Sequence, residues 1–362
     1  MHWDLRAVSS LLELTIDGYD GVDMVSFPGK MLLPSTLTSL NLFSLENLKF
    51  LDKGLLHLTS LKKLRIDRCY NLQSLPEEGL PSSITSLDIV VCRLLQPKCE
   101  FGGEYWPLIS QIPQLWTYKF IQSHSLYQNE ALHIPSLNEI STDCNEAPLL
   151  PALSICRCHE GDSQASICYK VCVGGDWKRG CMQWDLQTFH SLVKIVIESC
   201  DDVEAFPGEM LLPSTLISLQ INGFQNLKSI DYKGLQDLKN LTVVNCPKLE
   251  LFLGGVLPSQ LESLGICKCS KLVAHLMHWD LRAASSLLEL TIDGYDGVDM
   301  VSFPGKMLLP STLTSLNLIS LENLKFLDKG LLHLTSLKNL GIGRCYNLQS
   351  RLKKGCRPPL LR

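Results

Sequence analysis

The sequence predicts an α/β solenoid, a horseshoe in which parallel strands line the concave face and irregular or short helical segments return along the convex face. A short leucine frame recurs along the chain, one long segment occurs twice, and 45% of the 362 residues are hydrophobic, which is enough for a core. The 33 basic and 37 acidic side chains leave a formal net charge of −4. This near-neutral balance argues against nucleic acid or an anionic membrane surface as a partner.

The short frame consists of three apolar residues and a cysteine, and its clearest unit is Leu61, Leu64, Ile66 and Cys69. The frame returns at 84–92, 192–200, 238–246, 261–269 and 337–345. Its second position advances by 26, 24 and 23 residues along the series Leu14, Leu40, Leu64 and Leu87. These spacings lie within the range of about 20–29 that is typical of leucine-rich repeats. Each frame is predicted to be a short strand, and the units must stack as a leucine-rich-repeat solenoid to bury their apolar faces.

The recurring cysteine stands at the turn out of each strand. We expect small buried thiols at Cys69, Cys92, Cys158, Cys200, Cys246, Cys269 and Cys345. Fifteen cysteines could also indicate a disulfide scaffold, but such scaffolds are short, carry secretory signals and are low in leucine. The start of the chain lacks the features of a secretory signal, and no apolar stretch is long enough to span a membrane. We therefore expect a cytoplasmic protein with free thiols.

Two clusters carry metal-ligand residue types without the usual spacing. Cys156, Cys158, His159, Cys168, Cys172 and Cys181 lack the two C-x-x-C pairs of a zinc site. Asp17–Asp23, repeated at Asp293–Asp299, lacks the alternation and the final glutamate of a calcium loop. Nucleophile-elbow, zinc-protease and dinucleotide motifs are also missing. We expect no metal, no cofactor, no catalytic residue and no enzymatic activity.

The long repeat divides the chain, because residues 277–350 copy residues 1–74 with 69 of 74 positions identical. We expect leucine-rich repeats in 1–96 and 183–350, separated by residues 97–182, an end-cap-like segment and a degenerate, weakly repeat-like cysteine-rich insert. Leucine falls from 23 of 96 residues in the first repeat region to 8 of 86 in this insert, which holds a weak repeat trace ending at Cys158.

The last twelve residues, 351–362, share almost nothing with their counterpart, 75–86. Deletion of one base from a permitted codon reading of 75–86 reproduces this tail residue for residue. We interpret 351–362 as a frameshifted tail.

Several segments resemble one family of proteins. The runs 31–37 (MLLPSTL), 45–51, 58–61 and 72–80 (LQSLPEEGL) resemble the leucine-rich-repeat region of plant coiled-coil nucleotide-binding leucine-rich-repeat (NBS-LRR) disease resistance proteins. Residues 92–113 resemble that family's closing sequence, and the resemblance covers about 1–115 and 183–350. It implies a role in the defence response through binding of a pathogen effector or a guarded host protein.

The family's nucleotide-binding switch has no counterpart in this sequence. Gly29-Lys30 and Gly305-Lys306 are each followed by methionine and lack the upstream glycine of a phosphate loop. The resemblance therefore implies that any switch domain which the repeats contact lies in another chain.

Three hypotheses about function remain open. The first is a non-enzymatic protein-recognition module. The second is a truncated or pseudogene-like fragment without independent function. The third is a ubiquitin-ligase substrate adaptor with leucine-rich repeats, although the first ten residues hold no F-box-like helix.

The two long copies differ at five pairs of positions: Val8/Ala284, Phe43/Ile319, Lys63/Asn339, Arg65/Gly341 and Asp67/Gly343. Four of these pairs fall on outward strand positions, where either drift or selection by a bound partner can change residues. We predict a partner-binding concave face made by Asn41, Phe43, Lys63, Arg65, Asp67, Gln220, Asn222, Asn317, Ile319 and Asn339.

Overall fold

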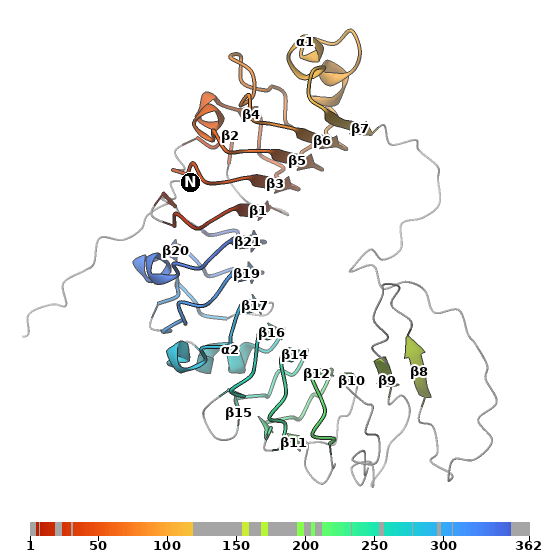
Figure 1. Ribbon diagram of the computed structural model, residues 1–362, viewed down its shortest axis with the longest axis vertical. Coiled ribbons are helices and arrows are strands. Elements are labelled where there is room, and N and C mark those ends of the chain that lie inside the picture. The colour runs from red at the N-terminus through yellow and green to blue at the C-terminus, as the bar shows by residue number, and fades with distance from the viewer. Residues whose placement is uncertain are drawn as a thin grey trace, which may run out of the picture.

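The computed structural model describes residues 5–118 except 7, 19–23 and 30–31; 154–158; 168–172; 194–198; 204–206; and 212–348 except 233, 253–256, 277, 295–297 and 306. Its main feature is a twelve-stranded sheet along the inner side of an arc (Figure 1). In spatial order the strands are β10 (Lys194–Glu198), β12 (Ser218–Asn222), β14 (Asn240–Val244), β16 (Ser263–Cys267), β17 (Glu289–Asp293), β19 (Ser315–Ile319), β21 (Asn339–Gly343), β1 (Glu13–Asp17), β3 (Ser39–Phe43), β5 (Lys63–Asp67), β6 (Ser86–Val90) and β7 (Gln114–Tyr118). Neighbouring strands pair in parallel, as expected for a solenoid of the leucine-rich-repeat type.

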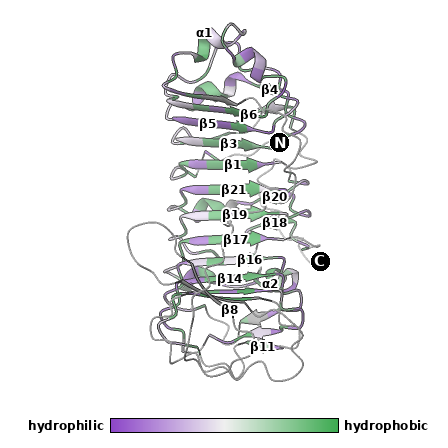
Figure 2. Cartoon of the chain, turned by 90° about the vertical axis from the view of Figure 1, so that its right-hand side faces the viewer, coloured by the Kyte–Doolittle hydropathy of each residue, from purple (hydrophilic) through white to green (hydrophobic). Residues whose placement is uncertain are grey.

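Each strand has one face toward the core, because successive side chains of a strand point in opposite directions. In β1, Leu14 and Ile16 are buried, while Glu13, Thr15 and Asp17 are partly exposed. The register places the second residue of one strand beside the second residue of the next. The leucines at this position therefore stack into a continuous apolar row, and Figure 2 shows the strands stacked above one another.

Short strands and tight turns form most of the return path on the outer side. The short strands are β2 (Ser26–Phe27), β4 (Phe50–Leu51), β11 (Ala205–Phe206), β13 (Ser229–Ile230), β15 (Leu251–Phe252), β18 (Ser302–Phe303) and β20 (Phe326–Leu327). The helical turns are η1 (Lys53–His57), η2 (Gln96–Cys99), η3 (Leu281–Ala283), η4 (Lys329–His333), α1 (Trp106–Ile109) and α2 (Ser270–Leu276). Phe27, Phe206 and Phe303 belong to these short strands, and their side chains are buried in the core. Among the described residues, no helix has the length and hydropathy needed to cross a membrane.

The residue directly after a main strand adopts a left-handed backbone conformation in most repeats. Among the described residues, seven non-glycine residues do so, with φ between 50° and 56°: Ser44, Arg68, Val91, Asn245, Lys268, Ser320 and Arg344. Except at Val91, the N–H of this residue donates to the carbonyl of the last residue in the next strand, as from Arg68 to Val90 at 3.0 Å. The turn therefore directs the chain out of the sheet and ties each repeat to its neighbour.

The repeated cysteines pack beneath this turn. Cys69, Cys92, Cys246, Cys269 and Cys345 are buried free thiols, which confirms the prediction at these positions. The Sγ of Cys345 donates to the carbonyls of Gly343 at 3.3 Å and Leu318 at 3.7 Å, and burial raises the pKa of Cys345 to about 12. The side chains of Cys158 and Cys200 lie outside the described residues.

The two repeat regions form one sheet in permuted order, as Figure 1 shows. The first array (residues 5–118) begins at β1, and β1 pairs with β21, the last strand of the second array (residues 194–348). Leu12 N and Glu13 N donate to Lys338 O at 2.8 and 2.9 Å, and Arg344 N donates to Asp17 O at 2.8 Å. These contacts repeat those of β1 with β3, where Thr38 N and Ser39 N donate to Leu12 O at 2.8 and 3.0 Å. The joint between the arrays is thus built like the contact between successive repeats.

Part of the expected insert has its own pairing. β8 (Ser154–Cys158) and β9 (Cys168–Cys172) form an antiparallel pair that is not hydrogen-bonded to the main sheet. The main sheet also continues past residue 96, because β7 pairs with β6. The tail, 351–362, lies outside the described residues.

Candidate functional site

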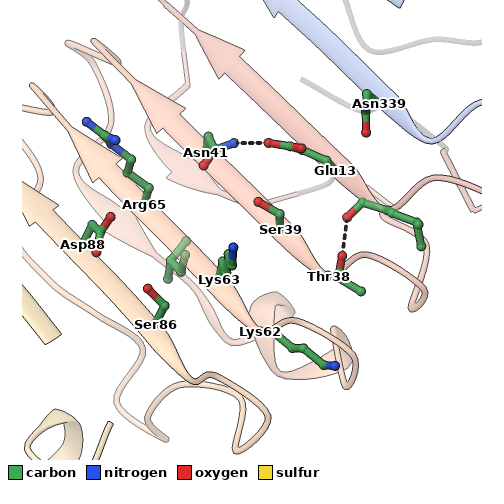
Figure 3. Close-up of a pocket in the computed structure, with 12 residues that line it drawn as sticks. Glu13, Thr38, Ser39, Asn41, Lys62, Lys63, Arg65, Ser86, Asp88 and Asn339 are labelled. Carbon is green, nitrogen blue, oxygen red and sulfur yellow. Dashed lines mark hydrogen bonds between the residues drawn. The ribbon is translucent and has the colours of Figure 1, made fainter. Parts of the chain in front are cut away.

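A hollow of about 550 Å³ lies on the sheet face where the two arrays meet. It spans the outward side of β21, β1, β3, β5 and β6, as the close-up in Figure 3 shows. Its lining consists of Leu12, Glu13, Thr38, Ser39, Asn41, Lys62, Lys63, Leu64, Arg65, Ser86, Asp88 and Asn339. Most of these residues are polar, and they stand on a rigid ladder of parallel strands.

One side of the hollow is organised around Asn41. Its Nδ2 donates to Glu13 Oε1 at 2.9 Å, as Figure 3 shows, and to Thr15 Oγ1 at 3.1 Å, so the amide links β3 to β1. The equivalent residue of the second array, Asn317, donates to Thr291 Oγ1 at 3.4 Å. The Asn41 bonds hold the Glu13 carboxylate at the wall of the hollow.

The other side is basic. Lys62, Lys63 and Arg65 are exposed, and neither lysine forms an ion pair with another described residue. The Arg65 guanidinium lies 5.5 Å from the centre of the Phe43 ring, and its terminal nitrogen is 3.4 Å from Asp67 Oδ2. The contact with the ring restrains Arg65 while its side chain stays 47% exposed. This side can therefore offer several N–H donors to a partner.

Two carboxylates near Arg65 differ in their surroundings. Asp67 is only 9% exposed, and Arg68 Nε lies 3.6 Å from its Oδ1. It therefore serves to position the arginines and offers little surface of its own. Asp88 is the register partner of Arg65 on β6, and its Oδ1 is buried without a hydrogen-bond partner among the described residues.

The predicted contact residues fall into three groups. Asn41, Lys63, Arg65 and Asn339 line the hollow. Phe43 and Asp67 stand at the ends of β3 and β5 and contact Arg65. The remaining four lie at partly exposed positions of the same sheet, further from the hollow: Asn317 and Ile319 on β19, and Gln220 and Asn222 on β12.

The structure adds residues that the sequence analysis did not select. Glu13 and Asp88 occupy the same outward frame, so the frame alone could have identified them. Lys62 precedes β5 and falls outside that frame. The approach of Asn339 to Glu13 depends on the joint, since these residues are far apart in the sequence. No group of three or more possible metal ligands occurs among the described residues, and the side chains of the zinc candidates in β8 and β9 are not among them.

The fold and the polar face of the sheet define a parallel-strand solenoid consistent with a leucine-rich-repeat protein. The chain is similar to the putative disease resistance protein At3g14460 of Arabidopsis thaliana, with 29% identity over 344 residues. The match covers 91% of this chain and 21% of the relative, so the chain spans about a fifth of that protein's length. No protein-family model matches the chain. No solved structure matches it either.

Proposed function

We propose that the chain is a non-enzymatic protein-recognition module of the plant defence response, which binds a pathogen effector or a guarded host protein on the inner face of its sheet. The hollow across β21, β1, β3, β5 and β6 carries the proposal, because the strands there hold polar side chains in fixed positions at a surface that a partner can reach. The similarity to a disease resistance protein supports the biological setting. The free thiols of the described cysteines fit a reducing compartment, and we place the protein in the cytoplasm.

The chemistry of the hollow indicates which part of a partner would enter it. Lys62, Lys63 and Arg65 form a basic side, so we expect the partner to insert an acidic segment there. Asp88 stands on the adjacent strand β6, and Glu13 stands two strands away on β1; both would accept hydrogen bonds from the same segment. The partner is a protein, and a nucleotide-binding switch domain in another chain is one form it can take.

The second copy of the long repeat suggests a direct test. The Lys63→Asn/Arg65→Gly variant installs the residues found at Asn339 and Gly341 and removes two positive charges from the hollow. Proteins captured by the wild-type chain in extracts of infected plant tissue are identified, and their affinity for both chains is measured. We expect binding to weaken about tenfold or more, since an arginine at the centre of an interface often carries much of the binding energy.

A matched control removes the same charges elsewhere. Lys228 and Arg282 are exposed and pair with Glu204 and Asp280, away from the hollow. The Lys228→Asn/Arg282→Gly variant should bind as the wild type does. Equal loss in both variants, or no loss in either, would show that the hollow is not the binding site.

A further inference from the structure

The joint between β21 and β1 differs from the contact between β5 and β6 in the residues at the strand ends. β21 is the copy of β5, yet its neighbour is β1, whereas β5 has β6 as its neighbour. The last residue of β5, Asp67, lies beside Phe43 and Val90, neither of which is charged. The last residue of β21, Gly343, lies beside Ile319 and Asp17. The joint therefore brings a carboxylate to a place where the first array has none.

Gly343 is not required by space. A Cβ built on it would lie 3.6 Å from Asp17 Cβ, 3.8 Å from Ile319 Cγ2 and 4.0 Å from Asp17 Oδ2, all ordinary contact distances. Its φ is also not in the left-handed range. The Cβ of an aspartate at this position would therefore fit, but its carboxylate would lie beside that of Asp17. The difference between the copies thus removes a like-charge pair from the joint.

We propose that Gly343 adapts β21 to β1, because its lack of a side chain keeps a second carboxylate away from Asp17 where the two arrays join. Because Asn339 of β21 and Glu13 of β1 both line the hollow, closing the joint also completes the wall of that hollow. This inference stands on the joint itself and does not depend on the proposed function.

Hydrogen exchange of the full-length chain measures the joint directly, because Leu12 N and Glu13 N donate across it. Peptides that begin at Val8 distinguish this strand from its copy, where Ala284 stands instead. We expect Gly343→Asp to speed exchange in 8–17 about tenfold, while the isosteric Gly343→Asn stays within about twofold of the wild type. Adding Asp17→Asn to Gly343→Asp should restore the slow exchange.

If Gly343→Asp alone does not fold, the comparison of Gly343→Asp/Asp17→Asn with Gly343→Asn still tests the proposal, because both variants lack the like-charge pair and should exchange at similar rates. Equal acceleration by Gly343→Asp and Gly343→Asn would mean that size and not charge matters. That result, or fast exchange that persists in Gly343→Asp/Asp17→Asn, would overturn the proposal.

Discussion

The stability loss on exchange of Leu64 for alanine, compared with the loss for substitutions on the outward face, distinguishes core residues from surface residues of the sheet. Leu64 is 1% exposed on β5, with Leu40 and Leu87 as its register partners on either side. Leu64→Ala removes three carbon atoms, worth about 2.4 kcal/mol of transfer free energy at about 0.8 kcal/mol each. The unfilled cavity adds to this cost, so we expect a loss of about 2–5 kcal/mol.

The neighbouring substitutions on the outward face should cost far less. Lys63 and Arg65 are exposed, and the Arg65–Asp67 pair at 3.4 Å is a surface ion pair worth about 0–1 kcal/mol. The second array already carries glycine at the position of Arg65. We therefore expect Lys63→Asn/Arg65→Gly to lower stability by about 1 kcal/mol or less.

Urea unfolding followed by circular dichroism tests both expectations on the same chain. Because repeat arrays can unfold in stages, the midpoint is compared alongside the fitted free energy of unfolding. A midpoint loss for Lys63→Asn/Arg65→Gly as large as that for Leu64→Ala would refute the assignment of these residues to the surface.

Two further predictions follow from local geometry. Val91 has a φ of 52°, which is costly for a β-branched residue, so Val91→Gly should leave stability unchanged or raise it by up to about 1 kcal/mol. Val90→Gly within β6 should instead lower stability. Thermal unfolding of both variants tests this, and a loss for Val91→Gly equal to that for Val90→Gly would contradict the strain argument. Burial raises the pKa of the Asp17 carboxyl above 3.8 although the charges of Arg344 and Arg68 lower it. The folded chain therefore binds the Asp17 proton more tightly than the unfolded chain does. The stability that the protonated carboxyl contributes in acid is lost as the pH rises through the folded pKa. Asp17→Asn should therefore raise the unfolding midpoint at pH 7 and lose this advantage toward pH 3.8; a lower midpoint at pH 7 would show that Arg344 outweighs desolvation.

The solenoid and its strands could be predicted from the sequence because the signal is local and repeated. Leu61, Leu64, Ile66 and Cys69 recur at fixed spacing, and each of the first three must be buried for the repeat to stack. The same frame indicated Asn41, Lys63 and Arg65 as outward residues, and the structure places them around the hollow. Their role in binding a partner stays a prediction.

The order of the arrays could not be predicted in this way. The pairing of β21 with β1 joins strands that are far apart in the sequence, and identical repeat frames fit many stacking orders equally well. Lys62 was missed because it stands one residue before the outward frame of β5. The left-handed residues after the strands were missed because Ser44, Arg68 and Val91 share no residue type that favours such a turn.

The joint between the arrays decides whether the hollow exists, since the hollow spans it. Glu13 and Asn339 are register partners on β1 and β21. Neighbouring strands lie about 4.8 Å apart, and a disulfide needs Cα atoms about 4.4–6.8 Å apart. The variant Glu13→Cys/Asn339→Cys should therefore form a disulfide under mild oxidation, while Glu13→Cys/Ser218→Cys, with its second cysteine on the distant β12, should not.

Mass spectrometry after trypsin digestion reads the outcome, since residue 13 falls in the peptide 7–30 and residue 339 in the peptide 339–344. Mixing chains of natural and heavy isotopic composition before oxidation shows whether a link lies within one chain. We predict that 7–30 and 339–344 are linked within one chain. Alkylated free thiols at both positions, or a link found only between chains, would contradict it.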